Sequence, residues 1–147
     1  MEYWKYRAIN RLKGYSAQKV SLENIPEEIG RLKSEAYSIK SATGDGPPVK
    51  GSGSRREDRL LSDIVKRKEL EMLLERAKLA VSIVDRGLSV LSQDERHILD
   101  VMYIMRSKGY VDRLMGEFGL AEESSLYKKA NKALLRFTIA MYGATES

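Results

Sequence analysis

Residues 92–143 read SQDERHILDVMYIMRSKGYVDRLMGEFGLAEESSLYKKANKALLRFTIAMYG and decide the fold, because they predict three helices joined by short turns. Ser92 and Glu95 have the spacing of a capping box, in which a serine hydroxyl and a glutamate three residues later satisfy free backbone amides. We therefore expect a helix that starts at Gln93 and stops at Gly109. The side chains expected on its buried side are Ile98, Leu99, Met102 and Met105.

The second half of this stretch predicts a short helix, a tight turn and a longer helix. Apolar spacing over residues 111–118 indicates the short helix. Gly119 permits the left-handed backbone conformation of a turn, and Leu120 can fill the corner behind it. In the last helix, expected over residues 124–137, the apolar residues share one side: Leu126, Ala130, Ala133, Leu134 and Phe137.

The opposite side of this last helix carries basic and small polar residues and no acid. Lysines pair with phosphates or guanine edges, asparagine can bond adenine through two hydrogen bonds, and serines and amides at a helix N-terminus reach phosphates. Two short helices with a glycine turn and a basic second helix are typical of a helix-turn-helix that binds duplex DNA. We expect base contacts from Ser125, Lys128, Asn131 and Lys132, and DNA-backbone contacts from Ser124, Lys129 and Arg136.

Upstream of these helices, the composition predicts an arm, a loop and a long helix. Residues 3–15 have helical spacing that Gly14 weakens, and Pro26 suits the first position of a second arm helix. Residues 41–54, SATGDGPPVKGSGS, favour a flexible loop. Over residues 57–88 the apolar positions form one long stripe, whose partner is the arm or a second chain in a homodimer. The predicted all-α organisation is an N-terminal helical arm (1–40), a loop (41–56), a central helix (57–90) and a helix-turn-helix domain (91–147).

The composition argues against an enzyme, a metal protein and a membrane protein. The 147 residues are 42% hydrophobic and 32% charged, and the net charge of +5 permits binding to nucleic acid. Without cysteine there is no disulfide or usual zinc site, and His97 is expected to be a surface or packing residue. Asp94 and Glu95 suit the first turn of a helix better than catalysis. We expect a cytoplasmic protein with no cofactor, no metal and no membrane partner, since no long apolar segment occurs.

Residues 91–104 (LSQDERHILDVMYI), followed by YVDRLMGEFGL and SSLYKKANKALLRFTIAMYG, resemble the C-terminal region of phage transcriptional regulators of the ArpU and RinA type. That region is itself similar to region 4 of sigma factors. The resemblance is best in the tail motif N-x-A-L-L-x-F, formed by Asn131, Ala133, Leu134, Leu135 and Phe137. Ala121 stands where many such turns have a serine cap, so the expected cap is Glu122, Glu123 or Ser124.

The resemblance implies a protein that binds promoter DNA sequence-specifically and activates late or lytic phage genes beside the host RNA polymerase. Two alternatives stay open. One is a DNA-packaging subunit like the small terminase, which also joins a helix-turn-helix to helical oligomerisation segments. The other is a helical adaptor that binds only protein.

Overall fold

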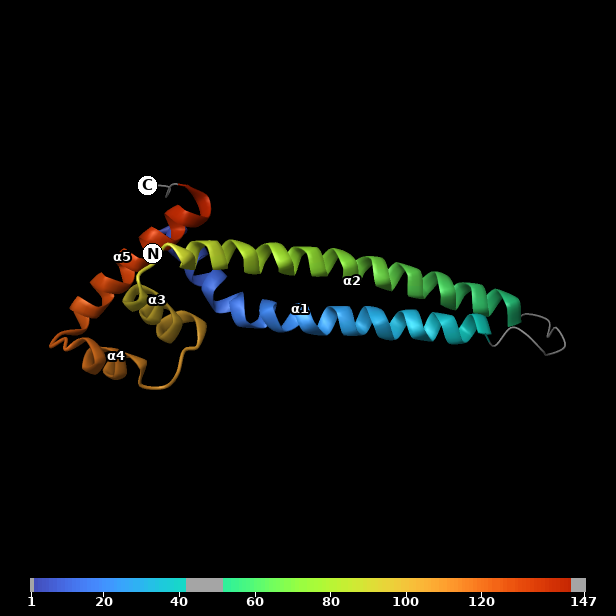
Figure 1. The fold of residues 1–147 in the computed structure, drawn as a ribbon, viewed down its shortest axis with the longest axis horizontal. Coiled ribbons are helices and arrows are strands. Elements are labelled where there is room, and N and C mark those ends of the chain that lie inside the picture. The colour runs from blue at the N-terminus through green and yellow to red at the C-terminus, as the bar shows by residue number, and fades with distance from the viewer. Residues whose placement is uncertain (1, 42–51, 144–147) are drawn as a thin grey trace. The chain divides into compact units, whose positions relative to one another are not determined.

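The computed structural model describes residues 2–41 and 52–143, and within these ranges the chain forms helices with short connections and no strand (Figure 1). The predicted all-α fold class is confirmed. Most of the predicted loop, residues 42–51, lies outside the described residues. The helices in chain order are α1 (Tyr3–Ser41), α2 (Ser52–Ser89), α3 (Gln93–Leu99), the π-helix η1 (Asp100–Ile104), α4 (Tyr110–Phe118) and α5 (Glu123–Tyr142).

The described chain divides into two compact units, and each long helix contributes to both. Unit 1 contains residues 2–19 and 79–143, and unit 2 contains residues 20–41 and 52–78. This division differs from the predicted one, in which residues 1–40 formed a separate arm. None of the described helices combines the length and the hydropathy that crossing a membrane requires.

Helix α1 is one continuous helix, so the prediction of two arm helices is wrong. Gly14 and Pro26 both lie inside it. A proline within a helix removes one backbone hydrogen bond and costs about 3 kcal/mol. Apolar side chains are buried on both sides of Pro26, among them Leu12 in unit 1 and Leu32 in unit 2. Burial of each leucine contributes roughly 1.5–3 kcal/mol, which offsets the cost of the proline.

The larger core of unit 1 joins the start of α1 to the end of α2, to α3 and to α5. Its buried residues are Ala8, Ile9, Leu12, Val84, Leu88, Leu91, Leu99, Ala133, Leu134 and Phe137. Gly87 permits the close approach of α2 to α5, because a Cβ atom there would lie 2.6 Å from Cε2 of Phe137. The first half of the predicted arm is therefore part of the core that holds α5.

A second core in unit 1 lies between α3, η1, α4 and α5. Leu120 packs against it from the turn, as predicted. The predicted apolar side of α5 is confirmed, since its five residues are fully buried. The buried residues of this second core are Ile98, Val101, Met102, Leu114, Leu126 and Ala130.

The capping box at the start of α3 is confirmed, but the helix ends earlier than predicted. The Ser92 amide donates to the Glu95 carboxylate at 3.1 Å, and the Glu95 amide donates to the Ser92 hydroxyl at 3.2 Å. In η1 the Met105 amide donates to the Asp100 carbonyl at 2.7 Å. This wider π-helical turn moves Met105 off the buried side, where it is 64% exposed, so the prediction of a buried Met105 is wrong. Gly109, with φ of 76°, precedes α4 as its N-cap and does not end the preceding helix.

In unit 2, the second part of α1 and the first part of α2 run side by side (Figure 1). Helix α2 begins at Ser52, before the predicted start at residue 57. The apolar stripe predicted for the long helix is only partly buried. Ala77 is buried, but Leu73 is 48% exposed.

Candidate nucleic-acid interface

Two helices and a tight turn determine which side of α5 is exposed. Helix α4 ends at Gly119, whose φ of 64° is the left-handed conformation that was predicted. The Leu120 amide then donates to the Met115 carbonyl at 2.9 Å, and extended backbone at Glu122 leads into α5. Because α5 packs on both α3 and α4, its opposite side faces solvent.

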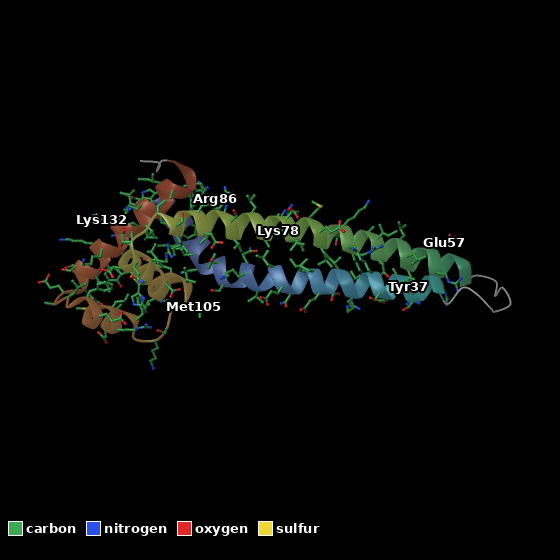
Figure 2. All side chains as sticks on the ribbon, viewed as in Figure 1. Tyr37, Glu57, Lys78, Arg86, Met105 and Lys132 are labelled. Carbon is green, nitrogen blue, oxygen red and sulfur yellow. The ribbon has the colours of Figure 1, made fainter. Side chains whose placement is uncertain are left out.

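The three lysines of α5 are exposed, and none of them has a partner within the described residues. Lys128, Lys129 and Lys132 form neither a hydrogen bond nor an ion pair with residues 2–41 or 52–143. Lys132 lies on the exposed side of α5 (Figure 2). Lys128 and Lys132 are about 6 Å apart along the helix axis, which approaches the axial rise of two nucleotides of duplex DNA. These lysines are therefore free to neutralise phosphates.

The predicted polar residues of α5 differ in how accessible they are. Ser124 is exposed, but its hydroxyl donates to the Glu122 carboxylate at 3.3 Å. Ser125 and Asn131 are half-buried. The side-chain amide of Asn131 has no polar partner in the described part of the chain, so it remains available to a ligand.

The N-terminus of α5 is acidic. Glu122 is the N-cap residue of α5, and it is one of the three residues that were expected there. Within the described residues, no side chain caps this helix through a hydrogen bond. Glu123 follows in the first turn. Both carboxylates interact favourably with the positive end of the helix dipole, and both repel a phosphate that approaches this end of α5. The basic surface of α5 therefore begins one turn further on, at Lys128.

Arg136 has an intramolecular partner that the sequence did not indicate. Its Nη1 atom pairs with the Glu95 carboxylate, and its Nη2 atom donates to the Val90 carbonyl at 2.9 Å. Glu95 also accepts the Ser92 amide, so one carboxylate connects the cap of α3 to α5. The charge of Arg136 is thus balanced within the protein, and its predicted contact with the DNA backbone would compete with this ion pair.

A cluster of tyrosines that the sequence did not indicate lies beside α5. Tyr127 is 40% exposed, and a hydrogen bond with Tyr110 raises its pKa. Arg106 donates to the Tyr110 hydroxyl at 2.7 Å and lies 4.6 Å from the centre of that ring. Burial raises the pKa of Tyr103 in the same cluster. These residues come from η1, the connection that follows it, α4 and α5. The spacing of residues along the sequence therefore could not indicate that they lie together.

His97 stabilises the contact between α3 and α4. Its Nε2 atom lies 2.5 Å from Glu117, which also accepts a hydrogen bond from Arg113 at 2.9 Å. The bond from Arg113, followed by that of His97, lowers the pKa of the Glu117 carboxyl. The His97 ring is 6.4 Å from that of Phe118. His97 is thus a packing residue near the surface, and within residues 2–41 and 52–143 no group of three His, Cys, Asp or Glu could hold a metal ion.

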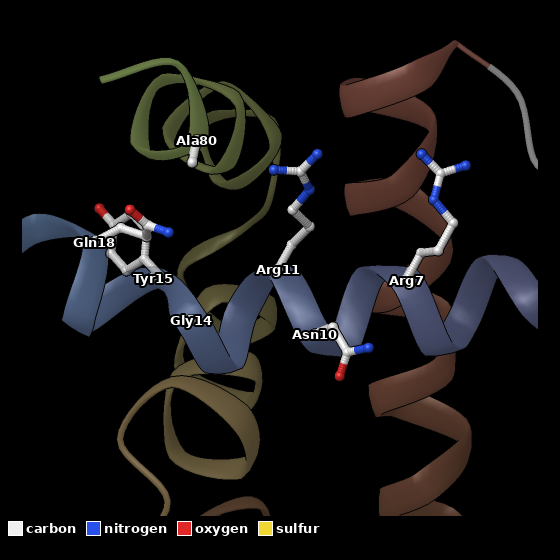
Figure 3. Close-up of a pocket in the computed structure, with 7 residues that line it drawn as sticks. All are labelled: Arg7, Asn10, Arg11, Gly14, Tyr15, Gln18 and Ala80. Atoms are coloured by element: carbon white, nitrogen blue, oxygen red, sulfur yellow. The ribbon is translucent and has the colours of Figure 1, made fainter. Parts of the chain in front are cut away.

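A second group of basic side chains lies along the first half of α1 (Figure 3). Arg11 donates to the Tyr142 hydroxyl at 3.1 Å, and the Arg7 guanidinium lies 4.6 Å from the centre of the Tyr142 ring. Both arginines thus contact the C-terminal end of α5, where the helix dipole favours positive charge. They join α1 to α5 beside a pocket of about 270 Å³, which is lined by Arg7, Asn10, Arg11, Gly14, Tyr15, Gln18 and Ala80.

Comparison of this chain with protein-family models, with curated proteins and with solved structures finds no match.

Proposed function

We propose that this protein is a sequence-specific double-stranded DNA-binding regulator of the phage type, in which α4, the turn at Gly119 and α5 act as a helix-turn-helix. The observation that carries the proposal is the contrast between the two sides of α5. One side is fully buried in both cores, and the other has three lysines without a partner in the described residues. A major groove about 12 Å wide accepts a helix of this kind, and its phosphates are the natural partners of unpaired lysines.

In the proposed complex, Ser125, Lys128, Asn131 and Lys132 contact base edges and Lys129 contacts the backbone. Ser124 would have to give up its hydrogen bond to Glu122 to reach a phosphate. The tyrosine cluster extends this surface, because Tyr127 and Arg106 can reach phosphates at the edge of the groove. The resemblance to ArpU and RinA regulators supports the same assignment. Activation of late or lytic genes belongs to this proposal.

A second candidate function is a protein-binding adaptor, and it is favoured by exposed apolar side chains on α5. Leu135 and Ile139 are 38% and 45% exposed. Their helical spacing places them on the same side as Lys128 and Lys132, one to two turns further on. A regulator would use this part of α5 to contact the host RNA polymerase, whereas an adaptor would bind only protein.

Removal of two lysines distinguishes these functions. The double variant Lys128→Ala/Lys132→Ala should lower affinity for the preferred duplex on the order of 50-fold or more, because each lost base contact costs about 1–3 kcal/mol, and should reduce the preference for that duplex over an unrelated one. Fluorescence anisotropy with labelled duplex DNA measures both quantities, and circular dichroism checks helicity. The matched control is Lys33→Ala/Lys66→Ala, which removes the same charge from exposed sites in unit 2.

The control should bind DNA as the unmodified protein does. Equal affinity of the α5 variant and the control would contradict the proposed interface. Absence of salt-dependent duplex binding in the unmodified protein would favour the adaptor.

A further inference from the structure

The pocket beside the first half of α1 has a positively charged wall. Its volume is about 270 Å³, and of the described residues that line it two are arginines, Arg7 and Arg11, and none is acidic. Both arginines leave the same side of α1 and their guanidinium groups point the same way, whereas Asn10 points away from them (Figure 3). The lining residues all belong to unit 1, so the pocket is a concave site within one compact unit.

Neither arginine forms an ion pair within the described residues. The Arg7 guanidinium lies 5.6 and 4.6 Å from the centres of the Tyr3 and Tyr142 rings, and its N–H groups have no acceptor in this part of the chain. Arg11 uses only Nε, which donates to the Tyr142 hydroxyl at 3.1 Å, so both of its Nη atoms are free. Two like charges four residues apart on a helix repel each other. An anion bound between them would remove this repulsion and accept the free N–H groups.

Small residues on two helices leave space beside these charges. Gly14 lines the pocket from α1, and Ala80 lines it from α2. A Cβ atom at Gly14 would meet no atom within 4 Å, so the packing of α1 does not require glycine at this position. Gly14 and Arg11 are three residues apart and share one side of α1. The absence of a side chain at Gly14 therefore leaves room for a ligand next to the Arg11 guanidinium.

We propose that this pocket binds a small molecule through a phosphate monoester group. Such a group carries a charge of about −1.5 to −2 at neutral pH, which matches the two arginines, and its oxygens suit the fork of N–H donors on a guanidinium. A carboxylate carries one negative charge and balances only one arginine. The pocket is larger than one phosphate group, so it has room for an organic part of the ligand. The site does not depend on the proposed binding of DNA by α5.

Isothermal titration calorimetry of the full chain with phenyl phosphate, in a buffer without phosphate, tests the proposal. We expect saturable binding with a dissociation constant below about 1 mM. Phenyl sulfate has nearly the same shape but carries a single negative charge, and it should bind on the order of 10-fold more weakly. Absence of saturable binding of phenyl phosphate, or equal affinity for the two compounds, would overturn the proposal.

Substitutions in the pocket locate the binding. Arg7→Gln/Arg11→Gln should weaken phenyl phosphate binding at least about 10-fold, because it removes both charged donors. The matched control is Arg55→Gln/Arg59→Gln, which removes the same charge from exposed sites in unit 2 and should bind phenyl phosphate as the unmodified protein does. Gly14→Glu should abolish binding while preserving helicity in circular dichroism, since its carboxylate would occupy the space beside Arg11. Retained affinity in the Arg7/Arg11 variant or in Gly14→Glu would contradict the assignment.

Duplex DNA separates this pocket from a contact to the DNA backbone. Arg7→Gln/Arg11→Gln should bind duplex DNA as the control Arg55→Gln/Arg59→Gln does, because the pocket takes a small ligand. A loss of duplex affinity confined to the Arg7/Arg11 variant would assign these arginines to the DNA backbone and overturn the proposal. Failure of the unmodified protein to bind duplex DNA would contradict the proposed function of α5 and leave the phenyl phosphate result unaffected.

Discussion

The tightest contact in unit 1 is that between Gly87 of α2 and the ring of Phe137 in α5. A Cβ atom at position 87 would lie 2.6 and 2.7 Å from two ring carbons and 2.9 Å from Cγ of Met141. Ordinary contacts between carbon atoms are about 3.5–4.0 Å long, so the ring would have to move by about 1 Å. Phe137 is fully buried and cannot move freely. Overpacking of this kind costs about 1–3 kcal/mol, whereas alanine in a helix gains about 1 kcal/mol over glycine.

The difference between these two effects lowers the expected free energy of unfolding of Gly87→Ala by up to about 2 kcal/mol, as measured by urea denaturation followed by circular dichroism. Gly14→Ala is the control, because no atom lies within 4 Å of a Cβ there, and it should raise stability by roughly 0.5–1 kcal/mol. Phe137→Leu should be less costly when combined with Gly87→Ala than alone. If Gly87→Ala raises stability as much as Gly14→Ala does, the close packing of α2 on α5 is refuted.

Three further predictions follow from contacts in unit 1. Arg136→Ala should destabilise the protein by about 0.5–1 kcal/mol, because its ion pair with Glu95 is partly exposed. The same variant should reduce DNA affinity less than removal of a free lysine does. A larger loss of affinity would contradict the structural role of Arg136. Ser92→Ala should lower stability by about 1 kcal/mol through loss of the capping box, and an unchanged denaturation midpoint would argue against that box. Burial and then the hydrogen bond to Asp85 raise the pKa of Tyr15 from 10.0 to about 12, so its contribution to stability is complete below pH 10 and is lost as the pH rises through 12. Asp85→Asn should lower that pKa in an absorbance titration at high pH, and an unchanged titration would exclude the hydrogen bond as a cause.

The elements that sequence predicted well depend on local chemistry. Ser92 and Glu95 form the capping box because both partners lie within one helical turn. Gly119 takes the left-handed conformation that glycine favours. The buried side of α5 follows from helical spacing alone, because its apolar residues recur at intervals of three and four residues.

The elements that sequence did not predict depend on contacts between distant residues. Pro26 does not start a new helix, because apolar burial before and after it keeps α1 continuous. Arg136 carries the same charge as the lysines near it. Its role differs from theirs because the fold brings it into contact with Glu95 and Val90, which are distant in sequence. Met105 is exposed because a π-helical turn changes the period on which its burial was predicted.

The central claim is that α5 reads the sequence of duplex DNA. Selection of bound molecules from a random duplex pool by the full chain tests this claim most directly. The proposed interface predicts enrichment of one defined motif and loss of the enrichment in Lys128→Ala/Lys132→Ala. A bound pool with the same composition as the input would contradict it.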